Sequence, residues 1–212
     1  MNSPRILLAL SGASGAIYGL RLARELARRN VDLTFTATTS GQLVCCQETG
    51  LDLSGDPATT ARNLRDYLKL EAGIRVVASD DLFFSSASGS AAPDAMVVCP
   101  CSMGTLARIA AGISGNLIER SADVMLKEHR PLLLVPRETP LSEIHLENML
   151  RLARVGARII PAMPAFYQRP ESLDDMIDFV VGKVLDQMGF DNTLYRRWQA
   201  GLGVHGERPT QD

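Results

Sequence analysis

The first candidate for chemistry is a run of five small residues, Ser11 to Gly15, in the stretch LALSGASGAIYGLRLARELARR. An apolar run over Ile6–Leu10 precedes it, and apolar residues at helical spacing follow over Ile17–Arg29. The N–H groups that open a helix attract anions, because the helix dipole adds a partial positive charge there. The run lacks the G-x-G-x-x-G of a dinucleotide site and the Lys-Ser/Thr of a P-loop. It therefore predicts either an anion site or close packing of a helix on a strand.

Other expected strands end in residues that can hydrogen-bond a ligand. The strand Val31–Thr38 ends in hydroxyl residues, and the strand Ala95–Pro100 runs into CSMGT. The strand Pro131–Glu138 ends in an arginine and a glutamate, and Ser85–Pro93 forms a small-residue loop too long for a simple turn. In open parallel sheets, ligands bind beyond the carboxyl ends of the strands. We therefore expect these ends to line one binding edge.

The remaining elements continue the alternation of strands and helices. Two further strands are expected, at Arg75–Ser79 and Ala157–Met163. Helices are expected at Gln42–Glu48, Thr60–Lys69, from about Ser102, at Leu141–Arg154 and at about Ser172–Met188. Apolar strands separated by helices are typical of a parallel sheet covered on both faces. We predict one α/β domain over residues 1–212, a three-layer doubly wound sheet of Rossmann or flavodoxin-like type, with a helical tail at about 190–212.

The composition disfavours several classes of protein. A formal net charge of −2 over 212 residues gives no electrostatic attraction to nucleic acid or to an anionic membrane. No apolar run approaches the roughly 20 residues that span a bilayer, and no signal-peptide cleavage region is evident. The four cysteines fit neither a zinc knuckle nor a disulfide scaffold: Cys45, Cys46, Cys99 and Cys101. We expect buried, reduced thiols and a cytoplasmic protein.

Three long motifs carry a resemblance to a known family. They are GASGAIYG, CPCSMGTLARIAAGISGNLIERSADVMLKEHRPLLLVPRETPL and HLENMLRLARVGARIIPAMPAFYQRPESLDDMIDFVVGKVLDQMG. From about residue 5 to residue 198, the chain resembles the flavin prenyltransferases of the UbiX family. The resemblance implies transfer of a dimethylallyl group from dimethylallyl phosphate to reduced FMN, with bonds formed at flavin N5 and C6. It also implies a homo-dodecamer with flavin at subunit contacts, and a UbiD-type decarboxylase that receives the prenylated FMN.

The resemblance also assigns site residues. The FMN contacts that it implies are Gly12, Ala13, Ser14, Thr38, Ser102, Met103, Gly104, Thr105 and Arg137. The donor contacts that it implies are Arg120, Lys127, Glu138, Tyr167 and Lys183. Strand-end reasoning points independently to the first set only. A solvated basic stripe on one helical face explains Arg120 and Lys127 from the sequence alone.

Two positions depart from the family pattern, and one tail residue matches it. Lys183 stands where arginine is usual, which removes bidentate recognition of a phosphate. Thr38 stands where serine is common and keeps the hydroxyl group. Trp198 matches a family tryptophan and either covers the site of a neighbouring subunit or packs within the tail.

The implied chemistry gives the charged residues roles. The three cations Arg120, Lys127 and Lys183 stabilise the leaving phosphate by charge-assisted hydrogen bonds, so no metal is expected. Tyr167 is expected to hydrogen-bond the phosphate, and Glu138 to move a proton there.

Ring closure requires removal of a proton from the flavin. Ser14 with Glu48 is the candidate relay. The alternative for Glu48 is a plain charge at the end of a helix.

One acidic string points toward a metal instead. DDMID, at Asp174–Asp178, matches a DDxxD pattern that holds magnesium in other prenyl-transferring enzymes. Acids in the first turns of a helix are favoured by its dipole and are usually solvated, which is our expectation here. The three histidines show no ligand spacing: His129, His145 and His205.

Two other functions stay open. A flavin-dependent cysteine decarboxylase of the related fold needs a catalytic histidine after an early strand, where this chain has none, and an asparagine-bearing substrate motif. Asn116 lies in SGNLIERSAD, which belongs to the prenyltransferase pattern. The other alternative is a non-enzymatic FMN carrier. The pathway, ubiquinone synthesis or aromatic-acid breakdown, stays open, as does a monophosphate or a diphosphate donor.

Overall fold

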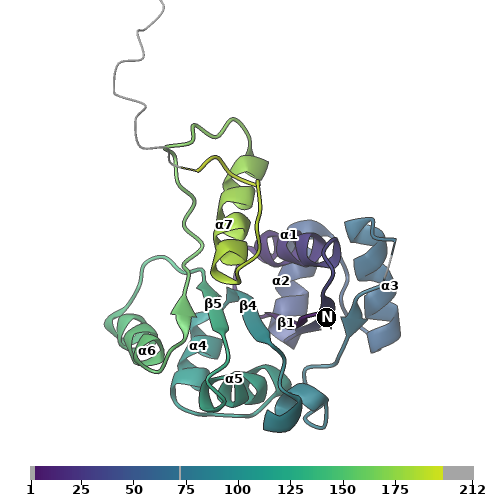
Figure 1. The fold of residues 1–212 in the computed structure, drawn as a ribbon, viewed down its shortest axis with the longest axis vertical. Coiled ribbons are helices and arrows are strands. Elements are labelled where there is room, and N and C mark those ends of the chain that lie inside the picture. The colour runs from purple at the N-terminus through teal and green to yellow at the C-terminus, as the bar shows by residue number, and fades with distance from the viewer. Residues whose placement is uncertain (1–2, 72, 198–212) are drawn as a thin grey trace, which may run out of the picture.

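The computed structural model describes residues 3–71 and 73–197, and within them the strands form one parallel sheet (Figure 1). The order across the sheet is β3-β2-β1-β4-β5-β6. The strands are β1 (Arg5–Leu10), β2 (Asp32–Ala37), β3 (Arg75–Val76), β4 (Ala95–Cys101), β5 (Leu132–Pro136) and β6 (Arg158–Ile159). Every residue of β4 and β5 is buried. Since successive side chains point to opposite faces, such burial requires helices on both sides.

Most helices begin where the sequence offers a capping side chain. The helices are α1 (Ala16–Ala27), α2 (Thr39–Thr49), α3 (Pro57–Leu68), α4 (Met103–Ala110), α5 (Leu117–Lys127), α6 (Glu143–Arg154) and α7 (Leu173–Gln187). All but α1 follow a side chain that accepts a backbone N–H of the first turn, namely Thr38, Asp56, Ser102, Asn116, Ser142 and Ser172. α1 instead follows Gly15, whose φ of +104° lies in the left-handed region. No helix in the described part of the chain is long and apolar enough to cross a bilayer.

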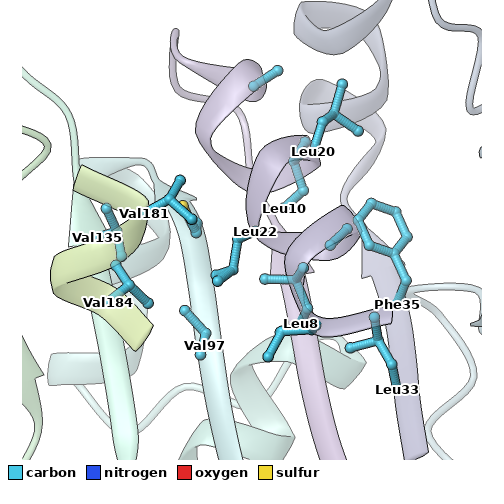
Figure 2. Packing of buried hydrophobic residues seen from close by; sticks show 14 of the residues in the cluster. Leu8, Leu10, Leu20, Leu22, Leu33, Phe35, Val97, Val135, Val181 and Val184 are labelled. Atoms are coloured by element: carbon cyan, nitrogen blue, oxygen red, sulfur yellow. The ribbon is translucent and has the colours of Figure 1, made fainter. Parts of the chain in front are cut away.

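The helices form two layers around the sheet. α1, α2, α3 and α7 pack on one face, and α4, α5 and α6 pack on the other. Figure 2 shows side chains of α1 and α7 lying over the central strands: Leu20, Leu22, Val181 and Val184 from the helices, and Leu8, Leu10, Val97 and Val135 from the strands. The predicted three-layer parallel α/β sheet is therefore confirmed.

The strand order also locates a binding edge. The chain leaves β3 at one edge of the sheet and crosses to β4, which lies beside β1. The strand order reverses between β1 and β4, and ligands of doubly wound sheets bind outside the carboxyl ends at such a switch point. Both strand ends carry residues that the sequence singled out.

Two elements and the tail differ from the sequence expectation. β3 and β6 contain two residues each, although longer strands are expected at Arg75–Ser79 and Ala157–Met163. Both are edge strands that pair on one side only, so fewer ladder hydrogen bonds hold them. The tail contains no helix over residues 190–197. The rest of the expected helical tail, with Trp198, lies outside the described residues.

The cysteines correct one expectation. Cys45, Cys99 and Cys101 are buried, but Cys46 is exposed, because adjacent residues of a helix point about 100° apart. All four are free thiols. Burial raises the pKa of the Cys99 thiol, and it raises that of Cys101 to about 12.

Candidate active site

Packing accounts for some of the glycines at the strand ends but not for all of them. A Cβ on Gly12 would lie 2.6 Å from Cβ of Ser40, and one on Gly41 would lie 2.7 Å from the Leu10 carbonyl oxygen. A Cβ on Gly104, in the first turn of α4, would meet no atom within 4 Å. Close packing therefore explains Gly12 and Gly41, whereas Gly104 leaves a stretch of backbone open to a ligand.

The start of α1 is capped from a distance by Glu48. Its carboxylate accepts hydrogen bonds from the N–H groups of Gly15 and Ala16, both at 2.9 Å. This brings Glu48, at the end of α2, next to Ser14. A carboxylate at this position offsets the positive end of the α1 dipole.

Ser11 joins the two strands at the switch point. Its hydroxyl donates to the Pro100 carbonyl oxygen at 3.1 Å and accepts the Ser102 N–H at 2.8 Å. Ser11 is fully buried. The sequence placed Ser11 in the small-residue run that predicts an anion site or close packing, but did not predict that it links the two strands.

The first turn of α4 presents backbone more than side chain. Ser102 Oγ accepts the Thr105 N–H at 3.2 Å and donates to Thr105 Oγ1 at 3.1 Å. Met103 and Thr105 are buried, whereas Gly104 is exposed. At this helix start the accessible groups are therefore mainly the backbone of Gly104 and the half-buried Ser102.

Arg137 reaches across from the end of β5 to the loop after β1. Its Nε donates to the Ser14 carbonyl oxygen at 3.0 Å. A Cβ on Gly15 would lie 3.0 Å from the Tyr18 ring and 3.8 Å from Cγ of Arg137. Burial, with the nearby Cys99, raises the pKa of Tyr18, and the Arg137 charge opposes that rise. Tyr18 is thus a neighbour of the site that sequence reasoning did not assign.

Two further side chains complete this edge. Thr38 Oγ1 accepts the Gly41 N–H at 3.0 Å, which leaves its own O–H able to donate. Glu138 Oε1 accepts the N–H of Thr139 at 3.0 Å. We call this set of strand-end residues the rim: Gly12, Ala13, Ser14, Gly15, Thr38, Ser102, Met103, Gly104, Thr105, Arg137 and Glu138.

Arg120 and Lys127 form a second group, on α5. Arg120 Nε donates to the Ala87 carbonyl oxygen at 3.2 Å, and its Nη1 lies 2.8 Å from Asp123 Oδ2. Lys127 Nζ lies 3.1 Å from Glu128 Oε1. The Ser85–Pro93 loop, expected at the rim, instead packs against α5: Ser86 Oγ lies 2.8 Å from Ser121 Oγ, and Ala87 accepts the hydrogen bond from Arg120.

Tyr167 and Lys183 form a third group, around α7. The Tyr167 ring meets the Phe179 ring edge-on at a centroid distance of 5.9 Å. Lys183 lies one turn further along α7, and its Nζ is 3.4 Å from Tyr195 Oη. Since α5 and α7 cover opposite faces of the sheet, the expected donor contacts fall into separate places within one chain.

The acidic string is used in packing rather than left to solvent. Arg21 on α1 pairs with Asp174, and its Nη1 lies 2.5 Å from Asp178 Oδ1. Asp175 caps α7 with Ser172. Asp174 is largely exposed as expected, but Asp178 is not. Over residues 3–71 and 73–197, no group of three or more His, Cys, Asp or Glu residues is placed to hold a metal ion.

Comparisons with known proteins give the family. Residues 1–185 match the Flavoprotein family. Flavin prenyltransferase UbiX of Pseudomonas aeruginosa is 50% identical over 200 residues, which cover 93% of this chain and 96% of that protein. The chain belongs to the flavin prenyltransferase UbiX family.

Solved structures agree with this assignment. A crystal structure of AnUbiX in complex with FMN and dimethylallyl pyrophosphate is similar at a TM-score of 0.82 and 41% identity, covering 93% of this chain and 98% of that one. The dodecameric FMN-dependent Ubix-like decarboxylase from Escherichia coli O157:H7 is similar at a TM-score of 0.81 and 40% identity, covering 92% and 99%.

The cysteine-decarboxylase alternative shares the fold alone with this UbiX family member. A PPC decarboxylase mutant in complex with pantothenoylaminoethenethiol is similar at a TM-score of 0.54 and 20% identity, covering 80% of this chain and 86% of that one. The gap between 20% and 50% identity favours the prenyltransferases as the nearer relatives.

Proposed function

We propose that this UbiX family member transfers a dimethylallyl group from dimethylallyl phosphate to reduced FMN, and that the prenylated FMN passes to a UbiD-type decarboxylase. The observation that carries the proposal is the 50% identity to a flavin prenyltransferase over 93% of the chain. The similarity to AnUbiX, whose crystal structure contains FMN and dimethylallyl pyrophosphate, supports FMN and a dimethylallyl donor, without deciding between monophosphate and diphosphate.

The rim fits FMN in its chemistry. A flavin needs close access to backbone and a few well-placed donors, and its phosphate needs positive charge. Gly104 supplies the open backbone, and Thr38 and Ser14 supply hydroxyl groups. Because Glu48 already occupies the start of α1, the start of α4 and Arg137 are the better candidates for the flavin phosphate.

The donor site is proposed to need more than one copy of the chain. Arg120 and Lys127 lie on α5, while Lys183 lies on α7, on the opposite face of the sheet, where Tyr167 packs against Phe179. A single phosphate is contacted by all four only if neighbouring subunits contribute. The dodecameric neighbour from Escherichia coli supports such an assembly, and we propose a homo-dodecamer here.

Each charged residue then has a defined task. Transfer breaks the bond between the allylic carbon and the phosphate oxygen, and negative charge grows on that oxygen. Arg120, Lys127 and Lys183 are proposed to neutralise it by charge-assisted hydrogen bonds, with Tyr167 as a further donor. Glu138 is proposed to move a proton at the phosphate.

Ser14 and Glu48 are proposed to carry away the proton that ring closure releases. In the structure the Glu48 carboxylate is bound to the N–H groups of Gly15 and Ala16, directly beside Ser14. The helix cap and the proposed relay therefore involve the same carboxylate group.

Release of inorganic phosphate tests the proposal. Purified protein is incubated anaerobically with dimethylallyl phosphate, with and without reduced FMN. We expect stoichiometric phosphate release that requires reduced FMN. A separate run with the diphosphate, assayed for released pyrophosphate, distinguishes the donors. Donor cleavage that is independent of flavin, or no cleavage with either donor, would contradict it.

A coupled assay addresses the partner. Filtered product from this reaction should activate a UbiD-type decarboxylase that was purified without cofactor.

The free thiols are consistent with the cytoplasmic location that we propose, since reducing compartments keep cysteines unpaired.

A further inference from the structure

We propose that Tyr195, in the segment that follows α7, is a positioning residue that holds the Lys183 ammonium ready for the donor phosphate. The inference deepens the proposed function and rests on it, because it takes Lys183 as a phosphate contact. It concerns the described part of the tail, which has no helix and folds back along α7 (Figure 1).

The segment is tied to α7 by its own hydrogen bonds. Asn192 Nδ2 donates to the Gly182 carbonyl oxygen at 3.2 Å and to Asp186 Oδ1 at 2.8 Å. Tyr195 is consequently only 9% exposed. A Cβ on Gly182 would lie 2.5 Å from Cδ1 of Tyr195, so the glycine at this position of α7 makes room for the ring.

The Tyr195 hydroxyl is oriented toward Lys183. The hydroxyl donates its proton to Asp186 Oδ2, so the lone pairs of Tyr195 Oη are left to accept hydrogen bonds from other groups. Lys183 Nζ lies 3.4 Å from that oxygen and 5.4 Å from the ring centroid, within the range of a cation–π contact. Burial, with the hydrogen bond to Asp186, raises the pKa of Tyr195 to about 12, so the phenol stays protonated at neutral pH.

The same cluster connects to the other expected donor contact of this group. Phe179 meets Tyr195 edge-on at 5.1 Å and Tyr167 edge-on at 5.9 Å. Tyr195 therefore belongs to one aromatic cluster with Tyr167, and Lys183 lies against it.

The need for such a contact follows from the lysine itself. A lysine is a flexible point charge that loses rotamer freedom when it binds a phosphate, whereas the planar fork of an arginine is pre-organised. The aromatic ring and the hydroxyl of Tyr195 restrict the Lys183 side chain and so reduce this loss on phosphate binding.

A double-mutant cycle tests the inference on the full-length protein saturated with FMN. Binding of dimethylallyl phosphate is measured by calorimetry for the parent, Tyr195→Phe, Lys183→Ala and the double variant. Tyr195→Phe should weaken donor binding about 2- to 10-fold, which corresponds to a hydrogen bond of roughly 0.5–1.5 kcal/mol at roughly 1.4 kcal/mol per factor of ten. In the Lys183→Ala background it should have no further effect. KM for the donor should rise with kcat little changed.

Controls separate positioning from packing. Tyr67→Phe, on exposed α3, is the matched control and should bind the donor like the parent. FMN affinity and thermal unfolding should stay close to parental values in Tyr195→Phe. If that variant does not fold, Asn192→Ala replaces it, since it removes two of the hydrogen bonds that tie the segment to α7 and keeps Tyr195 and Lys183.

The outcomes are distinct. Equal weakening by Tyr195→Phe in both backgrounds, or no weakening at all, overturns the positioning role. Parental donor binding in Lys183→Ala also overturns the positioning role of Tyr195. In that case, prenyl transfer by the parent protein would still support the proposed function. A parent that transfers no prenyl group defeats the proposed function, and the inference with it.

Discussion

The Glu48 carboxylate lies 2.9 Å from the backbone nitrogen of Gly15, so the last turn of α2 caps the first turn of α1. This contact shows which group binds the first N–H groups of α1. Glycine at position 12 allows close packing, and the helix start receives its anion from the chain itself. We propose that the ligand approaches the backbone at Gly104, in the first turn of α4, where a Cβ would meet no atom within 4 Å.

Replacement of Glu48 separates its cap from its charge. Glu48→Ala should destabilise the protein by about 0.5–2 kcal/mol, because the N–H groups of Gly15 and Ala16 lose their acceptor. Glu48→Gln keeps an acceptor oxygen and should cost less, about 0.3–1 kcal/mol, which is the usual size of the charge–dipole part. Urea unfolding measures both.

The proposed role of Glu48 in the proton relay is tested by measuring the turnover of the same two variants. A relay predicts that Glu48→Gln loses much more turnover than its small loss of stability explains. Parental stability in Glu48→Ala would contradict the cap, and parental turnover in Glu48→Gln would contradict the relay.

Two glycine substitutions should have different effects. Gly104→Ala adds a Cβ that meets no protein atom within 4 Å, so stability should be unchanged while FMN affinity falls at least about tenfold, or roughly 1.4 kcal/mol. Gly15→Val strains a residue with φ of +104° beside the Tyr18 ring and should cost about 1–3 kcal/mol of stability as well. Fluorescence titration of FMN and thermal unfolding follow the two effects. Full FMN affinity in Gly104→Ala would remove the start of α4 from the site.

Glu138→Gln tests proton transfer at the rim. The amide keeps the shape of the side chain and loses the ionisable group, so turnover should fall about 10²- to 10⁴-fold, the usual contribution of a general acid or base. FMN binding should change little. Glu147→Gln, an exposed glutamate on α6, is the matched control. Near-parental turnover would leave Glu138 with a positioning role at most.

Acid should destabilise the start of α5 through Glu119. Burial raises the pKa of this carboxyl, but hydrogen bonds from Arg108, the Gly115 N–H and Asn116 outweigh it and hold the pKa below its ordinary value of 4.5. The unfolded chain therefore takes up the proton first as pH falls, and the contribution to stability is present above about pH 4.5 and lost below it.

Urea unfolding at several pH values compares the parent with Glu119→Gln. The variant should be less stable at pH 7 and should lose less stability on acidification. Identical pH profiles for the two proteins would show that Glu119 does not couple folding to protonation.

The order of elements could be predicted from the sequence because the apolar periodicity is strong. The helix starts were predicted less well: α2 and α3 begin at Thr39 and Pro57, earlier than the expected Gln42 and Thr60, although capping side chains precede both. The prediction made the two edge strands too long. Val77, for example, is a residue type common in strands, but among the described residues no neighbouring strand lies on the outer side of β3 to pair with it.

Long-range contacts could not be predicted in the same way. The pairing of Arg21 with Asp178 joins residues far apart in the chain, so an acidic string that reads as solvated or metal-binding is in fact part of the α1–α7 contact. The sequence likewise gives no means of telling Gly12 from Gly104, since only the surrounding atoms decide whether a glycine serves packing or access.

The most direct test of the account is the mass of the flavin after anaerobic incubation of the purified protein with reduced FMN and dimethylallyl phosphate. Donor deuterated in its methyl groups provides a matched second run. The account predicts a flavin that has gained one dimethylallyl-derived unit, shifted by the label in the second run and absent when protein or donor is omitted. Flavin that binds to the protein and keeps its original mass would contradict the account and favour a carrier or a decarboxylase.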